Sequence, residues 1–154
     1  MWNKYYTKAK KPRETGKRRT LEELDYNELI GRLDKEFSCW IRHIHQIADG
    51  YCKCYTCGKI MPLKEAQAGH FVSRRYYNTR YHPDNVRPQC AGCNGPRAGE
   101  PMRFRINLCA EIGEEKVRQL ENIAVLGGER HLQRESLIIA IKMYREKNKK
   151  WKEK

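Results

Sequence analysis

Four cysteines, arranged as two Cys-x-x-Cys pairs, have the most distinctive metal-binding spacing in this chain. The pairs are Cys54 with Cys57 and Cys90 with Cys93. A two-residue gap lets both sulfurs of a pair reach one ion, and two pairs complete the tetrahedral set that holds structural Zn²⁺. We therefore predict one structural zinc ion. Cys52 offers another thiol beside the first pair, so Cys52 or Cys54 is the fourth ligand, with Cys54 favoured by its spacing.

One histidine and two asparagines in the same segment have the chemistry for metal-assisted attack on a phosphodiester. His70 is the candidate general base, because a neutral imidazole can take a proton from the attacking water. Asn94 would supply an oxygen ligand to a Mg²⁺ or Mn²⁺ ion, which stabilises charge on the leaving oxygen. Asn85 would hydrogen-bond the backbone or ring of His70 and fix its orientation. Each also has a structural alternative, since asparagines often serve turns and caps.

Helices are predicted on both sides of this segment, which makes α+β the expected fold class. Apolar residues at three- and four-residue steps predict a helix over residues 20–49. Short β-branched and aromatic runs predict a zinc-bound ββα core over 50–112, and further helices are expected over 114–141. A flexible basic arm over 1–19 and a basic tail over 142–154, continuing the last helix, flank one domain. The length of 154 residues suits a single core.

Positive charge is concentrated on the cysteine and histidine segment as well as at the two ends of the chain. The whole chain has a formal net charge of +13. Residues 53–105 hold ten basic side chains against three acidic ones, a net of +7. Such a concentration attracts polyanions, so we predict a nucleic-acid partner, contacted through phosphate-binding guanidinium groups. The candidate contacts are Arg74, Arg75, Arg80 and Arg97.

No feature of the sequence indicates a membrane or export. No apolar run reaches the length of a membrane span, and the basic N-terminus is not followed by the hydrophobic stretch of a signal peptide. The odd number of cysteines, seven, argues against a disulfide framework. The expected location is therefore the cytoplasm, which would be that of a bacterial host if a phage encodes the chain.

The motif between residues 54 and 94 resembles the HNH, or ββα-metal (His-Me finger), endonucleases. It reads Cys-x-x-Cys-Gly at 54–58, Gly-His-Phe at 69–71 and Asp-Asn-Val-x-Pro-Gln-Cys-x-x-Cys-Asn at 84–94. More narrowly it is similar to the NinG/Rap group of phage recombination nucleases, over roughly residues 30–112. The resemblance implies a hairpin and a helix around a magnesium-type ion, with His70 as base, Asn85 as its orienting residue and Asn94 as metal ligand.

The chain departs from this family pattern at the second ligand of the catalytic ion. Many HNH nucleases carry Asp or His just before the base, where this chain has Gly69, and some NinG/Rap-like sequences carry Asp at the position of Gln67. The replacement ligand would be His82, Asp84 or Glu100, or else waters and the substrate phosphate, which suits magnesium.

The resemblance implies an endonuclease that cuts branched recombination or replication intermediates and leaves 5′-phosphate and 3′-hydroxyl ends. A homodimer would suit paired cuts. Two other classes fit parts of the sequence. A non-catalytic zinc-finger nucleic-acid-binding protein explains the charge and the thiolates, and the missing acidic ligand supports it. A treble-clef-like adaptor for protein partners explains the zinc but not the basic charge around His70.

Overall fold

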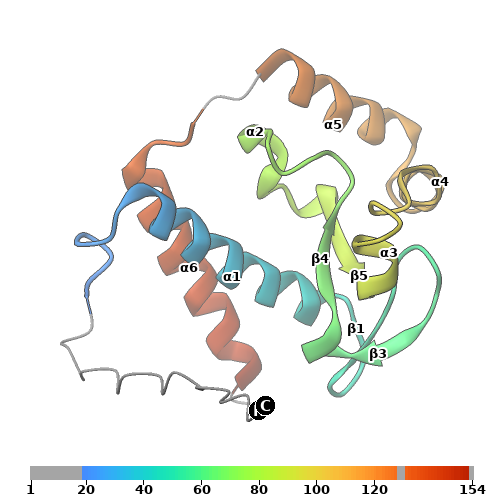
Figure 1. Cartoon of the computed structure of the whole chain (residues 1–154), viewed down its shortest axis with the longest axis horizontal. Helices are drawn as coiled ribbons and strands as arrows, with labels where there is room; N and C mark the ends of the chain where they lie inside the picture. The colour runs from blue at the N-terminus through green and yellow to red at the C-terminus, as the bar shows by residue number, and fades with distance from the viewer. Residues whose placement is uncertain (1–18, 128–130, 153–154) are drawn as a thin grey trace, which may run out of the picture.

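The computed structural model describes residues 19–127 and 131–152, and it shows a mixed helix and sheet fold (Figure 1). The predicted basic arm lies outside the described residues except for Arg19, as do the last two residues of the basic tail. The described residues contain no helix that is long and apolar enough to cross a membrane.

The first helix, α1, is shorter than the sequence pattern predicts. It spans Tyr26–Ile44 because Asp25 and Glu28 form a capping box, in which each side chain accepts from the other residue's backbone amide. The helix stops before residue 49 because the chain turns into strand β1 (Gln46–Ala48). Gly31 lies inside α1 without interrupting it.

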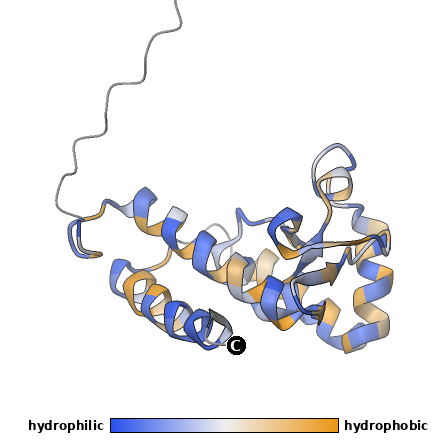
Figure 2. Cartoon of the chain, turned by 90° about the horizontal axis from the view of Figure 1, so that it is seen from below, coloured by the Kyte–Doolittle hydropathy of each residue, from blue (hydrophilic) through white to orange (hydrophobic). Residues whose placement is uncertain are grey.

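A long C-terminal helix, α6 (Arg134–Lys152), packs along α1, and the two lie side by side in both views (Figures 1 and 2). Their contact forms the largest apolar cluster, which includes Leu33, Phe37, Ile41, Leu137 and Ile141. These side chains recur every three or four residues, so one stripe of each helix leaves water. α6 continues through the basic segment after residue 141, and Tyr144 there is buried in the same cluster.

Two small antiparallel sheets lie beside this helix pair. One contains β1, β2 (Tyr51–Lys53) and β3 (Ile60–Pro62), and the other pairs β4 (Gln67–His70) with β5 (Val86–Gln89). In the second sheet Gly69 lies opposite Arg87 and His70 opposite Val86. Helix α1 packs against both β4 and β5. The β4–β5 hairpin is therefore held between α1 and the elements that follow it.

Short helices complete the fold around this hairpin. They are the 3₁₀ turns η1 (Leu63–Glu65) and η2 (Pro83–Asn85), and the one-turn helices α2 (Tyr77–Arg80) and α3 (Ala91–Asn94). Two longer helices, α4 (Pro101–Ile112) and α5 (Glu114–Gly127), pack on each other through Phe104, Leu108, Val117 and Leu120. The chain order β4, β5, α3 places a helix turn directly after the hairpin.

Candidate functional site

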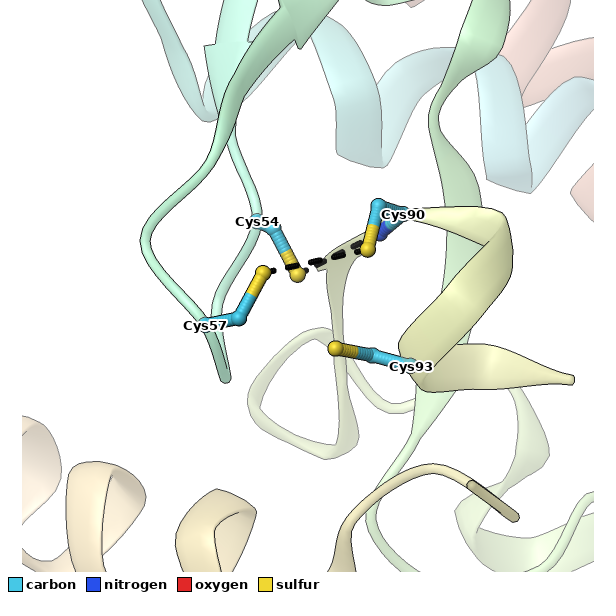
Figure 3. Close-up of side chains that lie close together, drawn as sticks. All are labelled: Cys54, Cys57, Cys90 and Cys93. Carbon is cyan, nitrogen blue, oxygen red and sulfur yellow. Dashed lines mark hydrogen bonds between the residues drawn. The ribbon is translucent and has the colours of Figure 1, made fainter. Parts of the chain in front are cut away.

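The four cysteines of the two Cys-x-x-Cys pairs meet at one point, although 33 residues separate Cys57 from Cys90. The first pair comes from the loop between β2 and β3, and the second from the start and body of α3 (Figure 3). Their four sulfurs lie within 4.8 Å of one another, and the Sγ atoms of Cys57 and Cys90 are 3.8 Å apart. Four sulfurs at about 2.3 Å from a tetrahedral ion would be about 3.8 Å apart. This cluster could therefore bind a metal such as zinc.

The surroundings of Cys54 favour its thiolate form, which is the form that binds metal. Burial opposes ionisation, but backbone amides from Cys57 and Cys90 and contacts with Thr56 outweigh it and lower the pKa of Cys54 to about 6. Cys52 is fully buried in β2 beside Met61, where burial raises its pKa, and it is not part of the cluster. The structure thus places Cys54, and not Cys52, in the cluster that could bind a metal.

His70, at the end of β4, lines a cavity of about 400 Å³ between α1 and the hairpin. Its Nε2 atom lies 3.2 Å from the carbonyl oxygen of Arg80. A carbonyl only accepts hydrogen bonds, so in the neutral tautomer that forms this contact Nε2 carries the proton and Nδ1 keeps an acceptor lone pair. This contact favours the tautomer whose Nδ1 atom can accept a proton.

Burial lowers the pKa of His70 below its ordinary value. The carbonyl groups of Arg80 and Ala68 and the carboxylate of Asp34 act in the opposite direction, whereas the positive charge of Arg74 lowers the pKa further. Desolvation dominates because it penalises the charged imidazolium. His70 is therefore neutral at pH 7 and able to accept a proton.

Asn94 and Gln67 lie together in the same cavity. The amide nitrogen of Asn94 donates to Oε1 of Gln67 over 2.8 Å, and both residues line the cavity with His70. Of the residues that the sequence offered as a second metal ligand, none lines this cavity. The Nδ1 atom of His82 accepts from the backbone amide of Asp84, and Glu100 pairs with Arg97. Gln67 is the residue that the fold brings to Asn94.

The side chain of Asn85 is buried and does not form the predicted hydrogen bond to His70. Its Oδ1 accepts from the amide of Val72, and its Nδ2 donates to the carbonyls of Val72 and Thr79. An amide that donates and accepts satisfies backbone groups inside the loop joining β4 to β5. Asn85 does act next to His70 through its backbone, because its carbonyl accepts from the amide of Phe71.

Side-chain packing explains why residue 69, just before His70, is glycine rather than an acidic or histidine metal ligand. A Cβ atom at this position would lie 2.0 Å from Oε1 of Gln89, whose side chain is fully buried. Gln89 is held there because its Nε2 donates to Thr56 and to the carbonyl of Gly99. Gln89 therefore fills the space that an acidic side chain at residue 69 would need.

Comparison with known proteins identifies the NinG part of the resemblance seen in the sequence. The family model described as Bacteriophage Lambda NinG protein matches residues 2–154. The chain belongs to the NinG family. It is 26% identical over 96 residues to the proteins named ninG of Escherichia phage lambda and Salmonella phage P22, an alignment covering 57% of this chain and 47% of each relative. The chain thus spans about half the length of the curated relatives it matches. No solved structure matches it.

The arginines predicted as DNA contacts in this NinG chain have different surroundings. Arg80 is only 9% exposed, and its guanidinium forms a two-point ion pair with Asp34, at 3.0 Å from Nε and 2.5 Å from Nη2. This arrangement makes Arg80 an interior residue rather than a surface contact, because α2 folds back onto α1. Of the other three arginines, Arg74 is exposed and lines the cavity of His70. Arg75 stacks on the ring of Tyr76. Arg97 forms an ion pair with Glu100 and contacts the sulfur of Cys93.

Sequence reasoning missed the contribution of α1 to this cavity. Lys35, Ser38 and Arg42 line it from the side opposite the hairpin, and Arg42 donates to the carbonyl of Ala66 over 3.1 Å. The signal was present as polar and basic residues on one face of an amphipathic helix. However, only the packing of α1 on β4 shows that this face borders His70.

Replacing Gly69 with alanine is expected to destabilise this NinG domain by about 1–3 kcal/mol, because the added methyl group would overlap Gln89. The matched control is Gly31→Ala in α1, where an added Cβ meets nothing within 4 Å. This control should be neutral or stabilising by up to about 1 kcal/mol, since alanine favours helix. Urea denaturation of both variants measures the difference, and equal stability of the two would contradict the packing role of Gly69.

Replacing Arg80 with alanine is expected to cost about 3 kcal/mol of stability, because Asp34 would lose its partner in a half-buried position. Arg74→Ala, which changes an exposed side chain, should stay within about 0.5 kcal/mol of the wild type. Thermal or chemical unfolding followed by circular dichroism compares them. If the Arg80→Ala variant were as stable as the wild type, Arg80 would again be a candidate surface contact for DNA.

Proposed function

We propose that this NinG-family chain is a metal-dependent DNA endonuclease of the HNH type. The observation that carries the proposal is the meeting of His70, Asn94 and Gln67 in one cavity bordered by Arg74 and Lys35. The order of hairpin and helix turn, β4, β5 and α3, supports a ββα-metal core. The four-cysteine cluster at the start of α3 supports a structural zinc ion that holds this core together.

In the proposed reaction, water attacks the phosphorus atom and the bond from phosphorus to the 3′ oxygen breaks. Nδ1 of His70 takes the proton of the attacking water, since Nε2 is committed to the Arg80 carbonyl. The leaving 3′ oxygen takes a proton from solvent. The products would be 5′-phosphate and 3′-hydroxyl ends, as the resemblance to HNH nucleases implies.

Asn94 fits the role of a ligand to Mg²⁺ or Mn²⁺. Its amide nitrogen is used by Gln67, and within residues 19–127 and 131–152 its Oδ1 accepts no hydrogen bond, so a carbonyl oxygen is left for a hard cation. Magnesium keeps several waters, and one or two protein oxygens suffice for it. When bound, the ion would stabilise negative charge on the leaving oxygen.

The alternative to an endonuclease is a protein that binds nucleic acid without cleaving it, and one observation favours this alternative. Asp34 is the single carboxylate among the described residues that line the cavity, and Arg80 and Tyr81 already bind it. No carboxylate there is left for a metal ion. In this alternative the chain binds DNA through its basic residues and zinc cluster, and His70 has only a structural role.

A cleavage assay separates the two functions. The full chain is incubated with a four-way junction, a replication fork and linear duplex, each with Mg²⁺, with Mn²⁺ and without added divalent ions. Metal-dependent cutting of any substrate supports the endonuclease, and preference for the junction or fork supports branched intermediates as its substrates. Binding to all three without cutting under either metal would establish the non-catalytic function. Sedimentation of the chain on the junction tests whether it acts as a dimer.

The pH dependence of cleavage follows from the state of His70. Its pKa is lowered from 6.5, chiefly by burial, so the ring stays neutral and active to lower pH than a free histidine. The acid limb of the pH profile for kcat/KM should therefore have its midpoint below 6.5. A midpoint clearly above that value, measured at saturating metal, would mean that His70 is not the base.

A further inference from the structure

Helix α1 carries a second basic surface, next to the cavity of His70, that the proposed catalysis does not use. It is a depression of about 430 Å³ lined by Arg19, Leu24, Glu28, Gly31, Arg32 and Lys35. Lys35 lines this depression and the His70 cavity as well, so the two are adjacent along α1. Arg32 and Lys35 are three residues apart and share one side of the helix.

The positive charges on this surface are available to a ligand. In the part of the chain that the structure describes, neither Arg32 nor Lys35 forms a hydrogen bond or ion pair, and Lys35 is exposed. The two carboxylates nearby are already engaged, because Glu28 pairs with Arg19 and Asp34 with Arg80. The excess charge that remains is therefore positive.

The floor of the depression is open to close approach. Gly31 lines it, and a Cβ atom built there would meet nothing within 4 Å. A ligand can thus come near the helix backbone at Gly31, beside Arg32 and Lys35, without displacing a side chain. An extended phosphate backbone fits such a shallow, positively charged strip, because phosphate contacts need charge and access rather than a closed pocket.

We propose that this face of α1 is a phosphate-binding track for the DNA strand on one side of the scissile phosphate. The inference rests on the proposed endonuclease function and adds to it a substrate subsite. From Arg42 at the His70 cavity to Arg32, ten residues of helix cover about 15 Å. This length corresponds to about four nucleotides at about 3.4 Å of axial rise each. The chain would therefore contact several nucleotides on one side of the scissile phosphate.

The test measures DNA binding by fluorescence anisotropy with a labelled 30-bp duplex and no added Mg²⁺ or Mn²⁺, so that no cleavage is required and the cysteine cluster keeps its metal. The variant is the double substitution Arg32→Ala and Lys35→Ala in the full chain. The control removes the same charge from exposed positions on α5, as Lys116→Ala and Arg118→Ala. The α1 variant should bind about tenfold more weakly at low salt, and the slope of log affinity against log salt should fall by about 1.8, or about 0.9 for each lost phosphate contact.

The outcomes separate this inference from the endonuclease proposal. If the wild type cleaves DNA and the α1 variant keeps its affinity and salt slope, the track is overturned while the nuclease stands. If the wild type never cleaves but the α1 variant alone loses affinity, the track stands and the nuclease fails. Equal losses in the α1 and α5 variants, or equal binding of the wild type to polyglutamate and to DNA, would also overturn the track.

Discussion

Replacing His70 with alanine is expected to lower the rate of DNA cleavage by about 10²–10⁴-fold, the usual contribution of a general base. The contact with the Arg80 carbonyl suits this proposed role, because the carbonyl accepts from Nε2 and leaves the lone pair on Nδ1. Burial keeps the ring neutral at pH 7. Affinity for DNA should change little, since a neutral imidazole contributes no charge to the phosphate contacts.

Single-turnover cleavage with Mg²⁺ or Mn²⁺, on whichever substrate the wild type cuts best, measures this effect. The matched control is His45→Ala, which removes a half-buried histidine that lines a different pocket. It should cut within a few-fold of the wild type. Circular dichroism and DNA binding show whether His70→Ala remains folded. A folded His70→Ala protein that cuts as fast as the wild type would remove His70 from the mechanism and leave nucleic-acid binding as the function.

Loss of the metal cluster should have the largest effect on stability. Cys90 immediately precedes α3, and its Sγ lies 3.8 Å from that of Cys57, so Cys90→Ser removes one of the four thiols through which a metal would join two distant segments. Structural zinc supplies about 10 kcal/mol or more of folding free energy in small domains, which is comparable to the whole stability of a typical protein. We expect Cys90→Ser to lose zinc and to leave residues 50–100 largely unfolded at 37 °C. Cleavage should fall as well, because α3 carries Asn94.

Metal content per chain and thermal unfolding test this expectation. The wild type should purify with about one zinc per chain, and chelation should lower its Tm. Cys39→Ser is the matched control, because Cys39 is half-buried in α1 and belongs to no metal-binding group among the residues that the structure describes. It should keep the zinc. A Cys90→Ser protein with full zinc content and unchanged Tm would show that the cluster does not hold a structural ion.

Local spacing was enough to predict the parts of this molecule that depend on near neighbours. A two-residue gap places both thiols of Cys54 and Cys57 on one side of a tight turn, so their shared metal-binding role can be predicted without knowledge of the fold. The apolar stripe of α1 is equally local. Spacing did not set the C-terminal end of α1, because the strand pairing of β1 with β2 competes with the last helical turn.

Only the tertiary structure decided which distant side chains share the cavity. Gln67 reaches Asn94 across 27 positions and Arg80 reaches Asp34 across 46, and neither contact leaves a pattern in the sequence. Because such pairs form when separate elements pack, their partners depend on the whole core rather than on residue spacing. The sequence alone thus determined the cysteine cluster and the candidate base. The packing of α1 and α2 on the hairpin decided what surrounds that base, since burial and long-range contacts exist only in the folded chain.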